Sequence, residues 1–195
     1  MVSMVAGTPA RSGALTVDDV LRMVDAGVLG SEDHVELLDG ELREMNAQGP
    51  VHSALPVRLQ QKLSACFGDA AHVRVHTNVQ LGERDLPEPD IAVVRGNNDD
   101  YLERLPRGDD LLLIVEISVT TQAHDRWKAG LYARAGVPEY WLLDVPGRTL
   151  TVHREPMREA LPGKAGYASV DVLEESGVVS VPGSDERWSV TTLLP

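Results

Sequence analysis

The sequence has little of several residue types, and each shortage limits what the protein can be. A single cysteine, Cys66, excludes an internal disulfide and a cysteine-based zinc site. The longest unbroken apolar run, residues 111–115, is far shorter than the ~20 residues that a membrane-spanning helix needs. The N-terminal residues lack a charged start followed by an apolar stretch, so they do not resemble a secretory signal. These shortages predict a cytoplasmic protein with no membrane partner, and residues 1–13 read as a disordered lead.

Positive charge and aromatic side chains are also scarce. The chain of 195 residues has 30 acidic residues against 18 lysines and arginines, which gives a net charge of -12. Such a balance opposes non-specific binding to nucleic acid, because basic side chains that neutralise phosphates supply most of that affinity. A role on nucleic acid therefore requires a local basic patch, a metal or a partner. Aromatic residues make up 4%, so Val, Leu, Ile and Ala must build the core.

Short apolar runs alternate with turn residues along the rest of the chain. The first part is predicted to form a helix, a hairpin with its turn at Asp39-Gly40, and a second helix, over residues 16–27, 34–45 and 52–68. Three strands, a helix and a further strand are expected over residues 72–81, 90–94, 111–118, 121–136 and 138–145. A β-meander is expected over residues 149–155, 167–174 and 177–182.

This order of elements predicts a mixed α/β fold. The strand–helix–strand unit over residues 111–145 should place its two strands parallel, which makes the sheet mixed, with helices packed against it. The hairpin precedes this sheet and a β-rich extension follows it. Since no internal repeat or low-complexity linker interrupts the chain, residues 14–195 are predicted to form one domain.

Two carboxylates are predicted to approach one another across neighbouring strands. If the strands over residues 90–94 and 111–118 pair antiparallel, Asp90 at the start of the first lies beside Glu116 near the end of the second. Glu116 is the only charge in its strand, and a buried strand should not carry an unpaired carboxylate. Strand alternation predicts one face that contains Leu112, Ile114, Glu116 and Ser118.

The following helix adds a candidate cation. Beside 15 arginines the chain has three lysines, which are Lys62, Lys128 and Lys164. Lys128 shares a helix face with His124 and Tyr132, and a lysine is a compact point charge that can contact a water or a phosphate. Two acids and a lysine suit phosphoryl chemistry: the acids hold Mg²⁺ (or Mn²⁺) through oxygen ligands, and the lysine stabilises developing negative charge.

These residues lie in segments that resemble a known family. "PEPDIAVV", "LLLIVEIS" and "HDRWKAGLYARAGVPEYWLLDV", together with "VELLDGELREM" and "GPVHSAL", are similar to the Uma2 family of restriction-endonuclease-like proteins in the PD-(D/E)XK nuclease superfamily. The resemblance covers about Val35 to Glu155. It implies a restriction-endonuclease-like mixed sheet flanked by helices, and an endonuclease that hydrolyses phosphodiester bonds of DNA with Mg²⁺ (or Mn²⁺).

The resemblance also implies roles for individual residues. Asp90 and Glu116 match metal ligands of the family, and the backbone carbonyl of Ile117 completes that implied set. The lysine of the superfamily usually stands two residues after the glutamate, where this chain has a serine; in this family the lysine comes from the next helix, which points to Lys128. Two further positions match an acidic residue that can add a metal ligand and a recurring histidine, namely Glu36 and His52.

The two central carboxylates also have ordinary structural interpretations. Asp90 can cap a turn, and Glu116 can form an ion pair with Arg126 or Arg134. Three aromatic residues are expected to pack in the protein interior rather than to contact a substrate, namely Trp127, Tyr132 and Trp141. Three acidic residues before Asp90 are expected to lie in a solvated loop, which are Glu83, Asp85 and Glu88.

The remaining candidates have similar alternatives. Lys128 can be a solvated helix lysine that pairs with His124 or Asp125. Glu36 can be an exposed hairpin residue, and His52 an ordinary residue at a helix start.

Three functions remain open at this point. The first is the metal-dependent endonuclease acting on DNA. The second is a non-catalytic interaction protein on the same fold, a homodimer or higher homo-oligomer, which the net charge of -12 favours. The third is a metal-dependent hydrolase of a small phosphate ester, although no Gly-rich nucleotide-binding loop occurs in the sequence.

Overall fold

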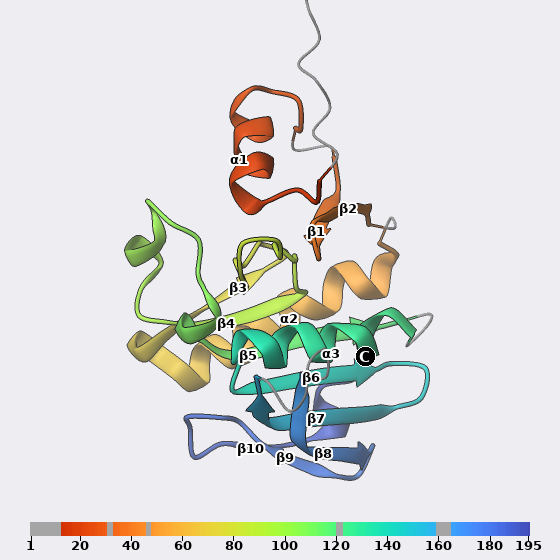
Figure 1. Ribbon diagram of the computed structural model, residues 1–195. Helices are drawn as coiled ribbons and strands as arrows, with labels where there is room; N and C mark the ends of the chain where they lie inside the picture. The colour runs from red at the N-terminus through yellow and green to blue at the C-terminus, as the bar shows by residue number, and fades with distance from the viewer. Residues whose placement is uncertain (1–12, 31–32, 46–47, 120–122, 159–164) are drawn as a thin grey trace, which may run out of the picture.

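In the computed structural model a six-stranded mixed sheet forms the centre of the fold (Figure 1). The described residues are 13–30, 33–45, 48–119, 123–158 and 165–195, with the backbone alone over residues 123–126. The lead expected over residues 1–13 therefore falls almost wholly outside them. The strands lie side by side in chain order, as β3 (Ala71–Val75), β4 (Ile91–Arg95), β5 (Leu111–Ser118), β6 (Glu139–Asp144), β7 (Thr149–Met157) and β8 (Gly166–Glu174). Only β5 and β6 pair parallel among these neighbours, so the predicted mixed sheet is confirmed.

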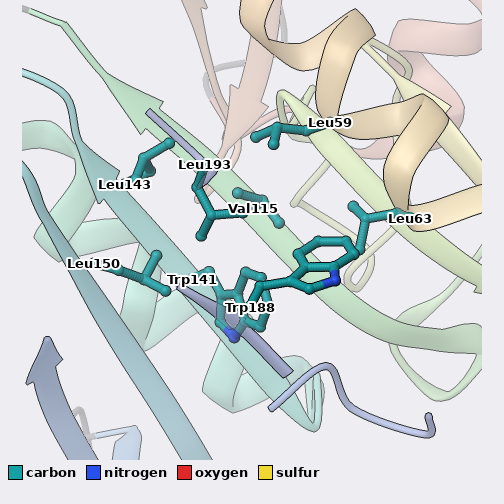
Figure 2. A pocket seen from close by; sticks show the side chains of 8 residues that line it. All are labelled: Leu59, Leu63, Val115, Trp141, Leu143, Leu150, Trp188 and Leu193. Carbon is teal, nitrogen blue, oxygen red and sulfur yellow. The ribbon is translucent and has the colours of Figure 1, made fainter. Parts of the chain in front are cut away.

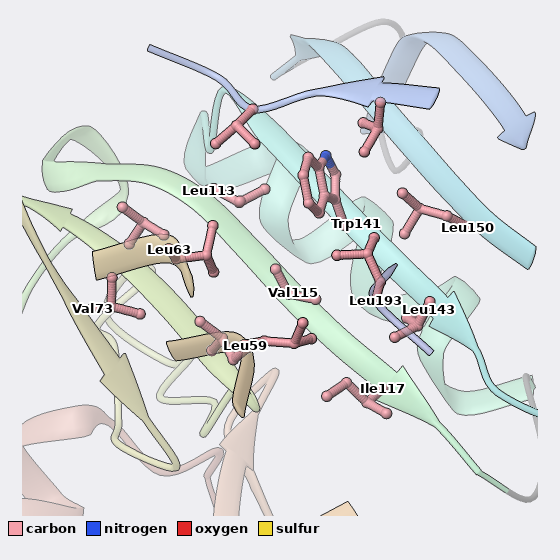
Figure 3. Close-up of a cluster of buried hydrophobic side chains, with 14 of the residues drawn as sticks. Leu59, Leu63, Val73, Leu113, Val115, Ile117, Trp141, Leu143, Leu150 and Leu193 are labelled. Atoms are coloured by element: carbon pink, nitrogen blue, oxygen red, sulfur yellow. The ribbon is translucent and has the colours of Figure 1, made fainter. Parts of the chain in front are cut away.

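Two helices cover opposite faces of this sheet. α2 (Pro50–Phe67) packs Leu59 and Leu63 into a large core with the strand side chains of Val93 and Leu113 (Figure 3). α3 (Ala123–Ala135) packs Leu131 and Tyr132 into a second core, with strand side chains from the opposite face of the sheet, namely Ala92, Ile114 and Tyr140. α3 ends as expected at Gly136, whose φ of +78° suits a glycine after the last helical turn. The central strands β4, β5 and β6 are thus buried on both faces.

The N-terminal elements form a smaller unit at one end of the sheet (Figure 1). Thr16 caps α1 (Val17–Asp25) through a reciprocal capping box with Asp19, as the N-cap prediction requires. β1 (Val35–Leu38) and β2 (Glu41–Glu44) form the predicted hairpin. A bridge between Leu37 and Leu86 joins this hairpin to the segment before β4.

Helix α2 differs from the prediction at its start. It begins at Pro50 rather than at His52, so Pro56 lies in the helix interior and not in its first turns. Proline has no N–H, so it cannot donate the helical hydrogen bond to the carbonyl of His52. Burial of Leu59 and Leu63 against the sheet keeps the helix continuous despite this loss.

A bulge changes the predicted alternation of β5. The pairing with β4 shifts register between Val93 and Val94. As a result Leu112 packs with the α2-side core, while Leu111 joins Ile114 in the α3-side core. The regular alternation that presents Glu116 holds only beyond this bulge.

The C-terminal region also departs from the predicted β-meander. β7 and β8 extend the main sheet, but β9 (Val178–Ser180) pairs with β10 (Arg187–Ser189) in a separate two-stranded sheet. Val179, Val190 and Leu193 pack into the α2-side core, and burying such side chains is worth about 2 kcal/mol each. This burial favours folding back onto the core over adding another edge strand. Four short 3-10 helices complete the described elements, as η1 (Gly68–Ala70), η2 (Asn98–Tyr101), η3 (Gly108–Asp110) and η4 (Val190–Thr192).

A small apolar cavity lies within the α2-side core (Figure 2). Its volume is about 10 Å³, and its walls are the side chains of Leu59, Leu63, Val115, Trp141, Leu143, Leu150, Trp188 and Leu193. A water molecule needs at least this space together with polar partners, so the cavity is a packing gap rather than a ligand site. Within the described residues no helix has the length and apolar character to cross a membrane.

The core predicts a specific stability loss for a truncation at Leu113. Its side chain is 0% exposed, so Leu113→Ala should lower the free energy of unfolding by about 3 kcal/mol through lost transfer energy and the cavity left behind. Urea denaturation followed by circular dichroism measures this loss. The matched control is Leu102→Ala, at a side chain that is 76% exposed, which should change the same free energy by less than about 0.5 kcal/mol. Equal losses in the two variants would contradict the assignment of the core.

Candidate functional site

Strands β4 and β5 bring Asp90 and Glu116 together. The strands pair antiparallel with Ile91 opposite Val115, so Asp90 lies beside Glu116 as the sequence predicted. The backbone N–H of Ile117 donates to Oδ2 of Asp90 at 2.7 Å, and that of Asp90 lies 3.4 Å from Oε2 of Glu116. Both acidic residues are only 5% exposed. The turn-capping interpretation does not describe Asp90, because its carboxylate contacts the neighbouring strand.

Lys128 of α3 joins two carboxylates from different elements. Its Nζ donates to Oε1 of Glu36 at 2.9 Å and to Oε1 of Glu116 at 3.1 Å. Burial opposes the charged form of Lys128, but the two carboxylates outweigh it and raise its pKa well above the ordinary value. Lys128 therefore stays protonated at every physiological pH. The alternative partners His124 and Asp125 have side chains outside the described residues.

The competing ion pair of Glu116 with Arg134 does not form. Arg134 instead contacts Asp39 at 3.0 Å and Asp85 at 3.1 Å, while the side chain of Arg126 lies outside the described residues. Asp85 is buried and accepts the backbone N–H of Asp39, so the prediction of a solvated residue was wrong for it. Asp85 is buried because it lies in the segment before β4 and its carboxylate binds the backbone of the hairpin at Asp39.

Tyr132 has a polar role in addition to the packing role that was predicted for it. The side chain is fully buried, and its hydroxyl donates to Oε1 of Glu116 at 2.5 Å. Burial, and then the charge of Glu116, raise the pKa of Tyr132 well above its usual value. The hydroxyl is therefore a permanent donor, and it fixes the orientation of the carboxylate. Ser118, where the superfamily's lysine usually stands, is buried and contributes no charge.

Glu36 is a buried member of the site and not an exposed hairpin residue. Its side chain is turned from β1 toward Lys128, and the backbone N–H of Glu88 donates to its Oε1 at 2.9 Å. Glu88 itself is half-buried rather than solvated. Burial, and then the charge of Glu36, raise the pKa of the Glu88 carboxyl. Negative charge is therefore concentrated on this side of Lys128.

Two histidines approach Asp90 on its other side. His52, in the first turn of α2, places Nε2 3.4 Å from Oδ2 of Asp90. His76 places Nδ1 3.7 Å from Oδ1 of Asp90, and its backbone N–H donates to the carbonyl of Asp90 at 3.3 Å. The two rings are stacked, with centroids 6.1 Å apart. One ligand atom from each of the three residues lies within 4.8 Å of the others, so the group has the spacing of a metal site.

His76 was missed by the sequence analysis, although a signal for it existed. It directly follows β3, which pairs antiparallel with β4 so that Val75 lies opposite Ile91. The argument that placed Glu116 beside Asp90 therefore also places His76 beside Asp90. Burial, and then the neighbouring His52, lower the pKa of His76, which favours the neutral ring.

Comparison with known proteins supports the resemblance found in the sequence. The model of the Uma2 family, described as "Putative restriction endonuclease", matches residues 17–192, which is more of the chain than the quoted motifs span. Among solved structures, the chain is similar to a crystal structure described as a "putative nuclease belonging to DUF820" from Anabaena variabilis. The TM-score is 0.69 at 18% identity, over 92% of this chain and 97% of that one. At this identity the likeness shows a shared fold. No curated protein matches the chain.

The hydrogen bond from Tyr132 to Glu116 should be worth more than an ordinary buried one. Tyr132→Phe removes a donor to a carboxylate and should lower the free energy of unfolding by about 2 kcal/mol. Tyr167→Phe is the matched control, because the hydroxyl of Tyr167 donates to the neutral carbonyl of Val137 at 2.9 Å in a similarly buried place. Its cost should be about 1 kcal/mol in the same urea titration. A smaller cost for Tyr132→Phe than for Tyr167→Phe would refute the charged acceptor.

Proposed function

Because the chain belongs to the Uma2 family, we propose that it is a metal-dependent endonuclease that hydrolyses phosphodiester bonds of DNA. One observation carries this proposal. Asp90, Glu116 and Lys128 converge from three separate elements into one buried hydrogen-bonded network. Buried ionisable groups that meet at one point, with shifted pKa values, are a pattern typical of functional sites.

The donor set of this network suits a divalent cation. Glu36 and Glu116 share the ammonium group of Lys128, so within the described residues this pair of buried carboxylates keeps excess negative charge. Buried negative charge is costly unless a cation compensates it. Carboxylate and carbonyl oxygens are the ligands that Mg²⁺ and Mn²⁺ prefer. Asp90, Glu116 and the backbone carbonyl of Ile117 would hold the ion, and Glu36 would stand as an additional acidic ligand.

The residues of the chain have distinct tasks in this proposal. A bound divalent cation supplies Lewis acidity and lowers the pKa of a coordinated water. Lys128, whose pKa is raised, acts as a fixed positive charge that stabilises negative charge developing on a phosphate oxygen, and not as a general base. Tyr132 holds Glu116 in one orientation through its hydroxyl. The carboxylates thus stay aligned before substrate arrives.

A non-catalytic interaction protein on the same fold is the second candidate. The observation that favours it is the net charge of -12, which opposes association with a polyanion. A nuclease fold by itself does not carry an activity. The two candidates differ in one respect, because only the endonuclease needs both Asp90 and Glu116 to retain their charge.

Neutralising either carboxylate should abolish cleavage. Asp90→Asn and Glu116→Gln keep the side-chain shape but remove the charge that binds the cation, so each should lower the rate by roughly 10²-fold or more. Nicking of supercoiled plasmid and of single-stranded oligonucleotides with Mg²⁺ or Mn²⁺ measures the rate. Asp99→Asn, at an exposed carboxylate in η2, is the control and should cleave as the wild type does. A wild-type protein that cleaves no nucleic acid with either metal would count against the endonuclease and for the interaction protein.

Removal of Lys128 should destabilise the protein in a pH-dependent way. Lys128→Met leaves Glu36 and Glu116 buried without their shared cation, which should cost about 3–5 kcal/mol near pH 7. In this variant the buried carboxylates bind protons more readily in the folded than in the unfolded chain, so the cost should shrink toward pH 5. Urea titrations at several pH values measure this trend.

In the wild type, the stability that Lys128 contributes should not change between pH 5 and pH 7. Its raised pKa means that the stability it contributes is fully present below the unfolded value of about 10.4 and is lost only at higher pH. Lys62→Met is the matched control, since Lys62 contacts the ring of Trp188 and a backbone carbonyl near the surface and has no carboxylate partner among the described residues. A cost for Lys128→Met that does not change between pH 5 and pH 7 would contradict the buried charge network.

A further inference from the structure

The two histidines beside Asp90 have no part in the tasks assigned above. We propose that His52, His76 and Asp90 form a binding site for a first-row transition metal ion such as Zn²⁺ or Co²⁺. This inference deepens the proposed function, because Asp90 belongs to both ligand sets. It adds, beside the oxygen-ligand site proposed for Mg²⁺ or Mn²⁺, a second cation site that shares Asp90 with it and has His76 as a ligand.

The distances among the three residues are close to those of a formed site. Ligand atoms lie about 2.0–2.2 Å from a Zn²⁺ ion, which places neighbouring ligands about 3.4 Å apart in a tetrahedron. His52 Nε2 is already 3.4 Å from Oδ2 of Asp90, and His76 Nδ1 is 3.7 Å from Oδ1. The three ligand atoms lie within 4.8 Å of one another. The two distances end on different oxygens of the carboxylate, so side-chain rotation would bring the three ligand atoms onto one ion.

The two rings are partly buried, with 22% and 25% of their side chains exposed. Nδ1 of His52 and Nε2 of His76 are buried and have no hydrogen-bond partner among the described residues. On each ring it is the other nitrogen that faces Asp90, and this is the nitrogen that would coordinate the ion. Coordination there would supply free energy that the contacts with Asp90 alone do not. The amide nitrogen of Gln48, 3.4 Å from Nδ1 of His76, is the group that a metal would displace.

The ligand types decide which cation fits. Imidazole nitrogen suits Zn²⁺, Co²⁺, Ni²⁺ and Cu²⁺, whereas Mg²⁺ binds through oxygen and keeps much of its water. Two imidazoles and one carboxylate therefore favour a transition metal over Mg²⁺. Three protein ligands leave a fourth position for water or a phosphate oxygen, which is the arrangement of catalytic rather than structural zinc sites. The ligands stand on the first turn of α2 and beside the ends of β3 and β4, so the backbone positions them firmly.

Direct titration with metal ions tests the site in the full chain. The metal-free wild type is titrated with Co²⁺, Zn²⁺ and Mg²⁺, with Co²⁺ followed by visible absorption and the others by calorimetry. His52→Ala and His76→Ala should each weaken Co²⁺ and Zn²⁺ binding by at least about 10-fold, which corresponds to about 1.4 kcal/mol. His72→Ala is the matched control. Its ring lies in β3 and contacts the carbonyl of Gly96, so it should leave binding unchanged.

A second measurement keeps the test valid if a histidine variant fails to fold. Crystals of the wild type soaked in Zn²⁺ should show anomalous density beside both imidazoles. An ion between Asp90 and Glu116 with neither ring coordinated would overturn the inference. Unchanged Co²⁺ affinity in both histidine variants would also overturn it.

The outcomes separate this inference from the proposed function. Glu116→Gln should retain Co²⁺ affinity while it loses the cleavage proposed above, since Glu116 is not among the three ligands. One outcome is that the histidine variants lose Zn²⁺ binding while the wild type cleaves no nucleic acid. This outcome would support the metal site and refute the endonuclease. The opposite outcome is that both histidine variants cleave with Mg²⁺ as the wild type does and keep its Zn²⁺ affinity. This outcome would support the endonuclease and refute the His52–His76–Asp90 site.

Discussion

The buried ammonium group of Lys128, shared by Glu36 and Glu116, is the interaction on which the rest of the site depends. It connects β1, β5 and α3, which belong to parts of the chain that are distant in sequence. Removal of the lysine would leave two buried carboxylates without their shared cation in a medium of low polarity, which costs several kcal/mol. The hairpin of β1 and β2 is therefore held to the sheet by charge as well as by the contacts of Leu37.

Strand register supplies the second constraint. β4 begins immediately after Asp90 and is flanked by β3 and β5, so residues of both neighbours stand level with this one carboxylate. The antiparallel pairings place His76 on one side of Asp90 and Glu116 on the other. Because a register slip of one residue would turn each side chain to the opposite face, the buried apolar faces of the sheet also keep the site in register.

Sequence reasoning reached the parts of the site that local periodicity determines. Antiparallel pairing of two adjacent apolar runs was enough to place Asp90 beside Glu116, and the rarity of lysine drew attention to Lys128. It did not reach features that depend on distant packing. Pro56 is accommodated within α2 by its buried face, and the strand over residues 178–180 leaves the meander because Val179 packs into the α2-side core. No local pattern contains that information.

The sequence analysis also missed contacts of the site that form only in the folded chain. Tyr132 lies on the helix face expected for packing, and its ring does pack, yet its hydroxyl meets a carboxylate that only the tertiary structure brings within reach. His76 is different, because the pairing of β3 with β4 that places it beside Asp90 follows from the same register argument that placed Glu116 there. A sequence pattern indicates which side chains share an element, whereas metal sites are made where elements meet.

The acidity of the chain and the acidity of the site have different physical consequences. Many surface carboxylates are paired with arginines, as in Arg104–Asp110 and Arg148–Glu175, and such exposed pairs contribute little and are screened by salt. The carboxylates around Lys128 are buried, where charge is screened far less. The net charge of -12 therefore describes long-range repulsion of a polyanion, while the buried excess describes a local demand for a cation. In the function proposed above, a cation bound there would reduce both effects at the place where a phosphate approaches, so a metal would make an acidic chain compatible with a phosphodiester substrate.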